Sequence, residues 1–99
     1  MEAFKTSAHV YMLSNCWGNV LYVGSTEDLK TRLYQHKRGM VPGFTQKYKV
    51  SKLVYYEEHV DVSSAEKREK QLKGKTRLKK NKIVETMNPN WNDLSFKVI

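Results

Sequence analysis

The sequence predicts an α+β fold in which a three-stranded antiparallel sheet packs with helices, in the chain order β-β-α-β-α-α. Three observations support this prediction. Short apolar runs at residues 10–13, 20–23 and 53–56 have the length and composition of strands. One segment with helical apolar spacing lies between the second and third runs, and two more follow the third. Turn residues between the first two runs indicate a hairpin.

The predicted hairpin begins with Val10-Tyr11-Met12-Leu13, whose alternation is typical of a half-buried strand. The second strand is expected over residues 20–23, with Gly24 ending it. Three residues with turn preference lie between the strands: Asn15, Gly18 and Asn19. Cys16 is the single cysteine, so a disulfide framework and a Cys-based zinc site are excluded, and we expect an ordinary thiol.

A helix is predicted over residues 27–38, and Gly39 is expected to stop it. Ser25-Thr26-Glu27-Asp28 offers a hydroxyl cap followed by acids in the first turn. Four side chains recur at i, i+3, i+4 and i+7 and therefore share one face: Leu29, Arg32, Leu33 and His36. A guanidinium and an imidazole thus accompany the apolar stripe, although either residue alone is compatible with snorkelling or a helix-edge position.

Residues 39–52 are expected to form a long loop around Pro42-Gly43. Its basic and aromatic side chains suit a mobile surface that meets phosphates and bases. After the third strand, Ser63 to Glu66 has the pattern of a capping box that opens a second helix, closed by Gly74.

A third helix is expected between a Thr76 cap and Asn88-Pro89. The tail is apolar enough to pack back on the domain through Trp91, Leu94, Phe96 and Val98. We therefore expect a loose leader at residues 1–8 and a single domain at residues 9–99. No apolar run approaches the roughly 20 residues of a membrane helix, and a signal-peptide core is lacking, so we expect a cytoplasmic protein with no membrane partner.

The charge distribution predicts a polyanion binder. The formal net charge is +8 and the sequence pI is about 9.6. Residues 30–52 hold seven Lys or Arg and no acid, and residues 63–82 hold nine against two acids. Such clustering is the electrostatic footprint of a nucleic-acid-binding protein. Solubility is the alternative explanation, although a small domain achieves it with less charge.

The order of four side chains in this sequence resembles the GIY-YIG nuclease family. His9-Val10-Tyr11 corresponds to the first family triplet and Tyr22-Val23-Gly24 to the second. Arg32 and His36 follow at the family's spacing. The departures are His9, where the family has Gly, and Val for Ile in both triplets. The resemblance spans roughly residues 10–92 and implies the family's fold. Within the family, this sequence is similar to the N-terminal nuclease domain of the excinuclease C subunit.

Glu69 is the candidate metal ligand. Ala65, Glu69 and Leu72 lie at i, i+4 and i+7, which places a carboxylate on an apolar stripe, where it is costly without a partner. An i,i+4 ion pair with Lys73 is the alternative role. Residues 68–73 are similar to the family helix that carries one metal-binding glutamate. The resemblance therefore implies that Glu69 holds a divalent ion, with Mg²⁺ expected, since Mg²⁺ binds through one carboxylate plus waters and phosphate.

The resemblance implies that the protein hydrolyses a phosphodiester bond. Tyr11 would accept a proton from the attacking water, directly or through a relay, and Tyr22 would orient the water or the phosphate. Arg32 would stabilise the charge on the phosphate in the transition state. His36 would serve as a proton donor or hydrogen-bond partner. Because an unperturbed tyrosine has a pKa near ~10, the nearby metal and cationic side chains would have to lower the pKa of Tyr11.

DNA is the expected partner, and RNA is not excluded. The phosphate contacts are expected from basic residues near the site: Lys37, Arg38, Lys47, Lys49 and Lys73. Pro89-Asn90-Trp91-Asn92 matches a pattern near the end of the family's domain, so Asn92 is a supporting candidate.

The first interpretation is a metal-dependent endonuclease that cuts DNA with little sequence preference, in a process such as DNA repair or recombination. Two alternatives remain open. One is a DNA- or RNA-binding module of the same fold that has lost turnover, although the joint presence of Tyr11, Tyr22, Arg32, His36 and Glu69 argues against it. The other is a basic protein of an RNA assembly, which the Lys-rich segment at residues 67–82 fits equally well.

Overall fold

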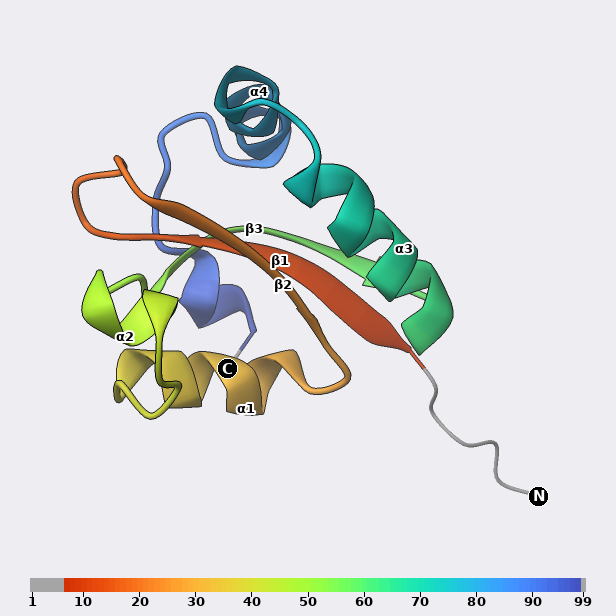
Figure 1. The fold of residues 1–99 in the computed structure, drawn as a ribbon, viewed down its shortest axis with the longest axis horizontal. Coiled ribbons are helices and arrows are strands. Elements are labelled where there is room, and N and C mark those ends of the chain that lie inside the picture. Colours follow the sequence, from red (N-terminus) through yellow and green to blue (C-terminus); the bar gives the residue numbers. More distant parts are fainter. Residues whose placement is uncertain (1–6, 99) are drawn as a thin grey trace.

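The computed structural model describes residues 7–98. The helices and strands, drawn in Figure 1, are β1 Ala8–Ser14, β2 Leu21–Thr26, α1 Leu29–Lys37, α2 Phe44–Lys47, β3 Lys52–His59, α3 Val62–Lys73, α4 Arg77–Met87 and a 3-10 helix, η1, Leu94–Lys97. The predicted leader is too long by at least one residue, because Ala8 already belongs to β1 and is buried. Residues 1–6 lie outside the described part of the chain.

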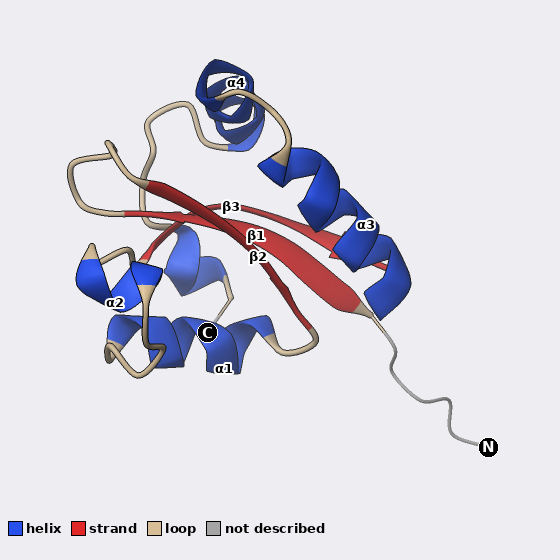
Figure 2. Ribbon diagram, viewed as in Figure 1, coloured by secondary structure: helices blue, strands red, loops and turns tan. Residues whose placement is uncertain are grey.

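The three strands form one antiparallel sheet in the order β2-β1-β3, which confirms the predicted fold class. The helices lie in two layers. Figure 2 shows α3 and α4 over one face of the sheet, and α1, α2 and η1 over the other. A register irregularity interrupts the β1–β3 pairing between Met12 and Leu13. The molecule is therefore a helix–sheet–helix sandwich with β2 as an open edge.

The central strand β1 is buried on both faces, so the prediction of a half-buried strand was wrong for it. Val10 and Met12 pack in the cluster under α3 and α4, whereas Tyr11 and Leu13 pack in the cluster under α1. Each buried Val or Leu side chain stabilises the fold by about 1.5–3 kcal/mol. Alternation revealed the strand, but it carries no information on how many faces are covered.

Two helix starts differ from the predictions. Asp28, rather than Ser25 or Thr26, caps α1 by accepting from the Thr31 amide at 3.1 Å. Asp61 caps α3 by accepting from the Ser64 amide at 2.8 Å, so the predicted capping box at Ser63 is not formed. A carboxylate satisfies an orphan N–H as well as a hydroxyl does and also interacts favourably with the helix dipole.

The helix stops and the third cap agree with the predictions. Thr76 accepts from the Lys79 amide at 3.2 Å and caps α4. Gly39 follows α1 with φ +68°, a left-handed conformation that glycine adopts without a steric penalty. Gly74 ends α3 as expected, but with φ −80° rather than in the left-handed region.

The segment 39–52 is more ordered than the predicted loop, because α2 lies within it. Thr45 and Val50 are buried, and the Val50 amide donates to the Thr45 carbonyl at 2.9 Å. In the C-terminal tail Leu94 is buried as expected, but Phe96 is 69% exposed, so the expectation that it packs back was wrong. Within residues 7–98 no helix has the length and apolar character needed to span a membrane.

Candidate active site

Tyr11 lies opposite Gly24 in the β1–β2 ladder, and this pairing explains the glycine. A Cβ at Gly24 would lie 2.6 Å from the Tyr11 hydroxyl oxygen and 2.7 Å from Cζ. Both distances are shorter than real Cβ contacts, so the phenol occupies the place of the missing side chain. The prediction that Gly24 ends β2 was wrong, because the strand continues to Thr26. The role of Gly24 is to let Tyr11 reach across the edge strand.

His36, which belongs to the predicted apolar stripe of α1, lies next to this phenol. His36 is buried, and its Nε2 lies 3.4 Å from the Tyr11 hydroxyl oxygen. The Tyr22 ring completes the cluster, with its centroid 6.3 Å from that of Tyr11 and 5.8 Å from that of His36. The His36 Nδ1 atom is buried and has no hydrogen-bond partner among the described residues. The hydroxyl of Tyr11 is therefore placed against one imidazole nitrogen.

The Tyr11 phenol is held in its protonated form. Burial, reinforced by Tyr22 and by the charge of Glu69, raises its pKa well above the usual value, and the opposing effect of Arg32 is smaller. The side chains present therefore do not, on balance, lower the pKa of Tyr11, as they would have to if Tyr11 acted as a phenolate base. Burial and the charge of Arg32 lower the pKa of His36 to about 4, so its imidazole is neutral at pH 7. A neutral phenol faces a neutral imidazole.

Glu69 reaches the site from α3, on the other face of the sheet. The Ser25 hydroxyl of β2 donates to Glu69 Oε1 at 2.5 Å, and Lys73 Nζ lies 2.6 Å from Oε2. Burial opposes ionisation, but the hydrogen bonds from Lys73 and Ser25 outweigh it and keep the pKa of Glu69 below its usual value. The carboxylate is therefore ionised, and 21% of the side chain remains exposed.

Glu69 has the chemistry expected of a hard-cation ligand. It is an ionised, partly accessible carboxylate, with a hydroxyl oxygen beside it. No group of three His, Cys, Asp or Glu side chains is placed to hold a metal within residues 7–98. A zinc-type centre is therefore absent from this part of the chain. A single carboxylate fits Mg²⁺, which keeps several waters and shares substrate phosphate oxygens.

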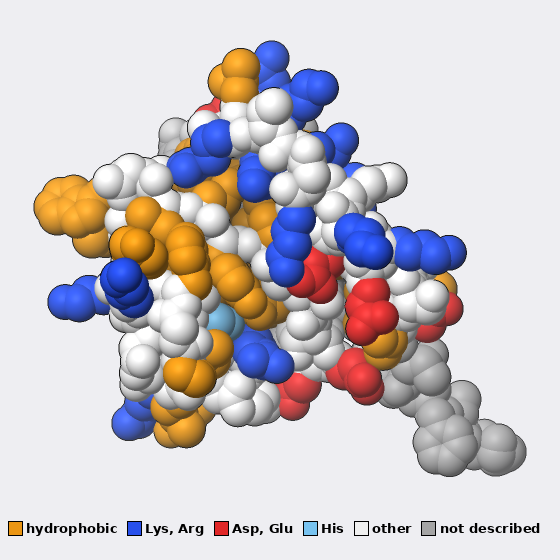
Figure 3. All heavy atoms as spheres, viewed as in Figure 1, with side chains coloured by type: hydrophobic (Ala, Val, Ile, Leu, Met, Phe, Trp, Pro, Cys, Tyr) orange, Lys and Arg blue, Asp and Glu red, His pale blue; other side chains and the backbone are white. Residues whose placement is uncertain are grey.

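The candidate active site, which we define as Tyr11, Tyr22, Arg32, His36 and Glu69, straddles the open edge of β2. Tyr11, Tyr22 and His36 belong to the α1 side, Glu69 comes from the α3 side, and Ser25 links the carboxylate to the strand. The charges of Arg32 and Glu69 act in opposite directions on the pKa of Tyr11, and Arg32 lines the same pocket as Ser25. In Figure 3 a His side chain is visible on this face, beside Lys or Arg and hydrophobic side chains.

Two of the predicted phosphate-binding lysines are engaged in ion pairs. Lys37 Nζ lies 2.7 Å from Asp93 Oδ2 and also donates to the Ser51 carbonyl at 3.1 Å. This pair ties the end of α1 to the tail. Lys73 is paired with Glu69 and therefore lies at the site itself.

The other predicted basic contacts surround α1 and α2. The Arg38 guanidinium lies 5.0 Å from the Tyr34 ring centroid, and Lys47 Nζ lies 5.4 Å from that of Tyr48. Lys49 follows α2 with φ +54°, an uncommon conformation for a residue with a side chain. Arg38, Lys47 and Lys49 are all exposed, so these three positions still present charge to solvent.

Asn92 is not brought to the candidate active site. Its side chain is exposed, and its backbone amide and carbonyl both pair with the side-chain amide of Asn88, at 3.0 and 2.8 Å. Asn88 is buried and also donates to the Val54 carbonyl at 3.1 Å. The buried asparagine of this region is therefore Asn88, which the sequence indicated only as a helix stop.

The contacts of two residues with the candidate active site were missed from the sequence. Ser25 was assigned to a helix cap, and Gly24 to a strand end. Extension of the period-2 pattern beyond Val23 would have found Ser25, because Val23 and Ser25 lie on the same face of β2. No signal in the local sequence predicts the contact of Gly24 with Tyr11, since this contact depends on the pairing of two strands.

We expect Gly24→Ala to destabilise the protein by about 1–3 kcal/mol, because the added methyl group collides with the Tyr11 phenol. Urea denaturation measures the change. Gly74→Ala is the matched control, since its nearest heavy atom would lie at 3.6 Å and its φ is −80°. That variant should be neutral or gain about 0.4–1 kcal/mol. Equal stabilities of the two variants would contradict the close packing of Tyr11 on Gly24.

Comparison with known proteins gives a consistent family match. The model of the GIY-YIG catalytic domain matches residues 7–82. UPF0213 proteins of Staphylococcus aureus strains Mu3 and N315 are each 32% identical over 77 residues, covering 78% of this chain and 94% of theirs. The solution NMR structure of a UPF0213 protein from Bacillus halodurans superposes with a TM-score of 0.57 at 24% identity, covering 89% of this chain and 93% of that one. The last similarity concerns the fold alone.

Proposed function

The chain belongs to the GIY-YIG family, and from that premise we propose that it is a metal-dependent endonuclease that hydrolyses DNA phosphodiester bonds with little sequence preference. One observation carries the proposal. His36 Nε2 lies 3.4 Å from the Tyr11 hydroxyl oxygen, and the charges of Arg32 and Glu69 act on the pKa of that phenol. As the edge strand, β2 pairs with a neighbour on one side only, which leaves room for an extended substrate.

The roles follow from the protonation states. Tyr11 is a neutral phenol, so it takes a proton from the attacking water only by passing its own proton on. His36 Nε2, 3.4 Å away and unprotonated at pH 7, is the acceptor at hand. Arg32 supplies a permanent cation for the equatorial phosphate oxygens, and Tyr22 positions the water or the phosphate. Glu69 would hold a divalent ion, which would supply charge stabilisation at the phosphate and the leaving group.

The second candidate function is a nucleic-acid-binding module that has lost turnover. Two observations favour it: the raised pKa of Tyr11, and the ion pair through which Lys73 already occupies Glu69. The basic surface would serve binding alone in that case. An activity test separates the two candidates, because both predict affinity for DNA and only one predicts cleavage.

The test is incubation of the protein with branched, nicked, duplex and single-stranded DNA, with Mg²⁺ or with EDTA. We expect cleavage products that require Mg²⁺ and binding that does not. Binding to all substrates with no cleavage under either condition would favour the module without turnover. Products that persist in EDTA would contradict the metal requirement.

A further inference from the structure

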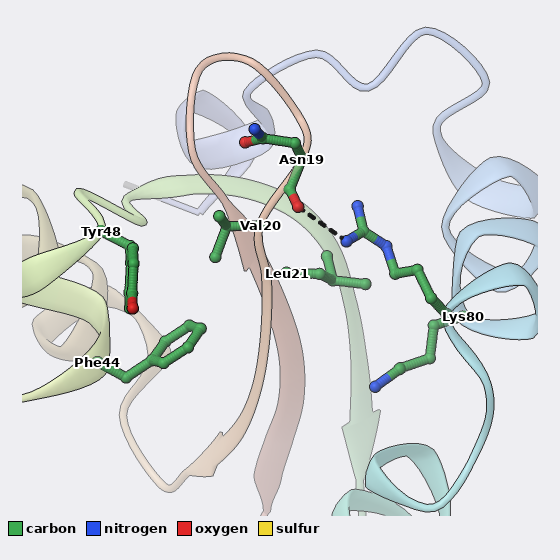
Figure 4. Close-up of a pocket in the computed structure, with 7 residues that line it drawn as sticks. Asn19, Val20, Leu21, Phe44, Tyr48 and Lys80 are labelled. Carbon is green, nitrogen blue, oxygen red and sulfur yellow. Dashed lines mark hydrogen bonds between the residues drawn. The ribbon is translucent and has the colours of Figure 1, made fainter.

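A groove crosses the β2 edge next to the candidate active site. Its volume is about 380 Å³, within the range of ligand-binding clefts. It is lined by residues of the hairpin, α2, its C-terminal flank and α4: Asn19, Val20, Leu21, Phe44, Tyr48, Arg77 and Lys80. In Figure 4, Phe44 and Tyr48 lie on one side of β2 and Lys80 on the other, with Val20 and Leu21 between them.

The aromatic wall of this groove continues the aromatic cluster of the site. The Tyr22 and Phe44 rings are stacked, with centroids 6.3 Å apart and an interplanar angle of 26°. Phe44 in turn packs on Tyr48 at 4.9 Å. A ladder of rings thus runs from Tyr11 through Tyr22 and Phe44 to Tyr48. Phe44 and Tyr48 are 48% and 43% exposed, so part of each ring is available to a ligand, although one face of Phe44 stacks with Tyr22 and the Lys47 ammonium lies 5.4 Å from the Tyr48 ring centroid.

The opposite wall is cationic. Arg77 donates to the Asn81 side chain at 2.8 Å and to the carbonyls of Asn19 and Gly18 at 3.1 and 2.7 Å. These bonds fix the guanidinium beside the groove and leave one N–H on each terminal nitrogen. The Lys80 ammonium makes no ion pair within residues 7–98, and none of the described lining residues is acidic. The wall therefore presents unneutralised positive charge.

Resting on the proposed function, we propose that this groove binds an unpaired nucleotide of the DNA strand whose phosphate lies at the candidate active site. Its base stacks on Phe44 and Tyr48, and its phosphate faces Lys80 and Arg77. The preferred substrates then carry unpaired nucleotides next to the scissile bond.

The aromatic wall and the cationic wall of the groove together favour an unpaired nucleotide as its ligand. An aromatic platform opposite cations is the arrangement that binds single strands, because every base has a π-face and every nucleotide a phosphate. Bases within a duplex are stacked on one another and cannot stack on Tyr48 without leaving the helix. The ring ladder gives the strand a continuous path from Tyr22 to Tyr48. A peptide ligand would not require that continuity with a phosphodiester-cleaving site.

The test compares binding of a fluorescein-labelled blunt hairpin duplex with that of the same duplex carrying a single-stranded tail, by fluorescence anisotropy in EDTA. We expect the tailed duplex to bind more tightly. Tyr48→Leu should remove about tenfold of affinity for the tailed duplex, the loss of one stacked base, and leave the blunt duplex unchanged. Phe44→Leu should act in the same direction. Lys80→Gln should lower the slope of log K against log salt by about 0.7 for the tailed duplex, the value for one single-strand phosphate.

Tyr34→Leu is the matched control, because Tyr34 is 52% exposed on α1 and does not line the groove. Equal affinity of wild-type protein for the two duplexes, or equal losses in Tyr48→Leu and Tyr34→Leu, would overturn the proposal. Binding in EDTA is independent of turnover. A Tyr48-dependent preference for the tail without cleavage in Mg²⁺ upholds the groove and removes the endonuclease assignment. Cleavage in Mg²⁺ without a Tyr48-dependent preference for the tail upholds the endonuclease assignment and overturns the groove proposal.

Discussion

Tyr11→Phe is expected to reduce Mg²⁺-dependent DNA cleavage by roughly 10²–10⁴-fold, the usual contribution of a positioned proton-transfer group. The change removes one oxygen, and the ring still fills the space above Gly24. Affinity for DNA should remain, because the proton is needed only when the water attacks. Single-turnover cleavage and a binding titration on the same preparation measure the two quantities.

The control for this variant is Tyr55→Phe. Tyr55 is also a buried sheet tyrosine with a bonded hydroxyl, but it packs under α3 and donates to Glu57 at 2.5 Å. Its phenyl variant should lose stability, because the partly buried Glu57 loses a donor, and should retain cleavage. If Tyr11→Phe cleaves at the normal rate, or loses activity only in proportion to its melting temperature, Tyr11 is a packing residue.

The number, type and order of the main elements could be predicted because each has enough length to show its period. Strands β1 and β2 contain alternation, and α3 and α4 each span three turns of sequence. The four-residue helices α2 and η1 could not be predicted in this way, because one turn has no period to detect. Their formation depends on buried Thr45 and Leu94, which is a tertiary property.

Helix starts were misassigned where several capping residues adjoin. The run from Ser25 to Asp28 offers four side chains that cap or favour a helix start, and Ser63 competes with Asp61 before α3. Their intrinsic preferences are similar, so the sequence does not rank them. In the structure Ser25 is committed to Glu69, a partner 44 residues away, and the cap falls to Asp28.

The membership of the candidate active site was predicted from the family resemblance, with helical spacing in support, whereas its electrostatics could not be predicted. Helical periodicity places Arg32 and His36 on one side of α1, and the same argument places Glu69 beside Ala65 and Leu72. The direction of the Tyr11 pKa depends on the burial of its hydroxyl between two strands and α1. Only the assembled structure shows that burial outweighs the nearby Arg32.

Glu69→Gln is expected to abolish Mg²⁺-dependent cleavage while leaving the fold intact. The amide still accepts from the Ser25 hydroxyl, so the link between α3 and β2 persists. The ion pair with Lys73, whose side chain is 53% exposed, is worth only about 0.3–0.5 kcal/mol. A neutral amide oxygen is a far weaker ligand for a hard cation than a carboxylate, and raising the Mg²⁺ concentration should not restore the rate.

DNA binding by this variant should persist or tighten, since a negative charge leaves the site and the Lys73 ammonium is released. Glu66→Gln is the matched control on the same helix and should cleave like wild type, because Glu66 is exposed and has no ion pair among the described residues. A purely structural Glu69 gives a different pattern, in which melting temperature falls and lost activity follows it. Wild-type Mg²⁺-dependent cleavage by Glu69→Gln would remove Glu69 from the metal site, because an uncharged side chain cannot replace the ionised ligand that this assignment requires.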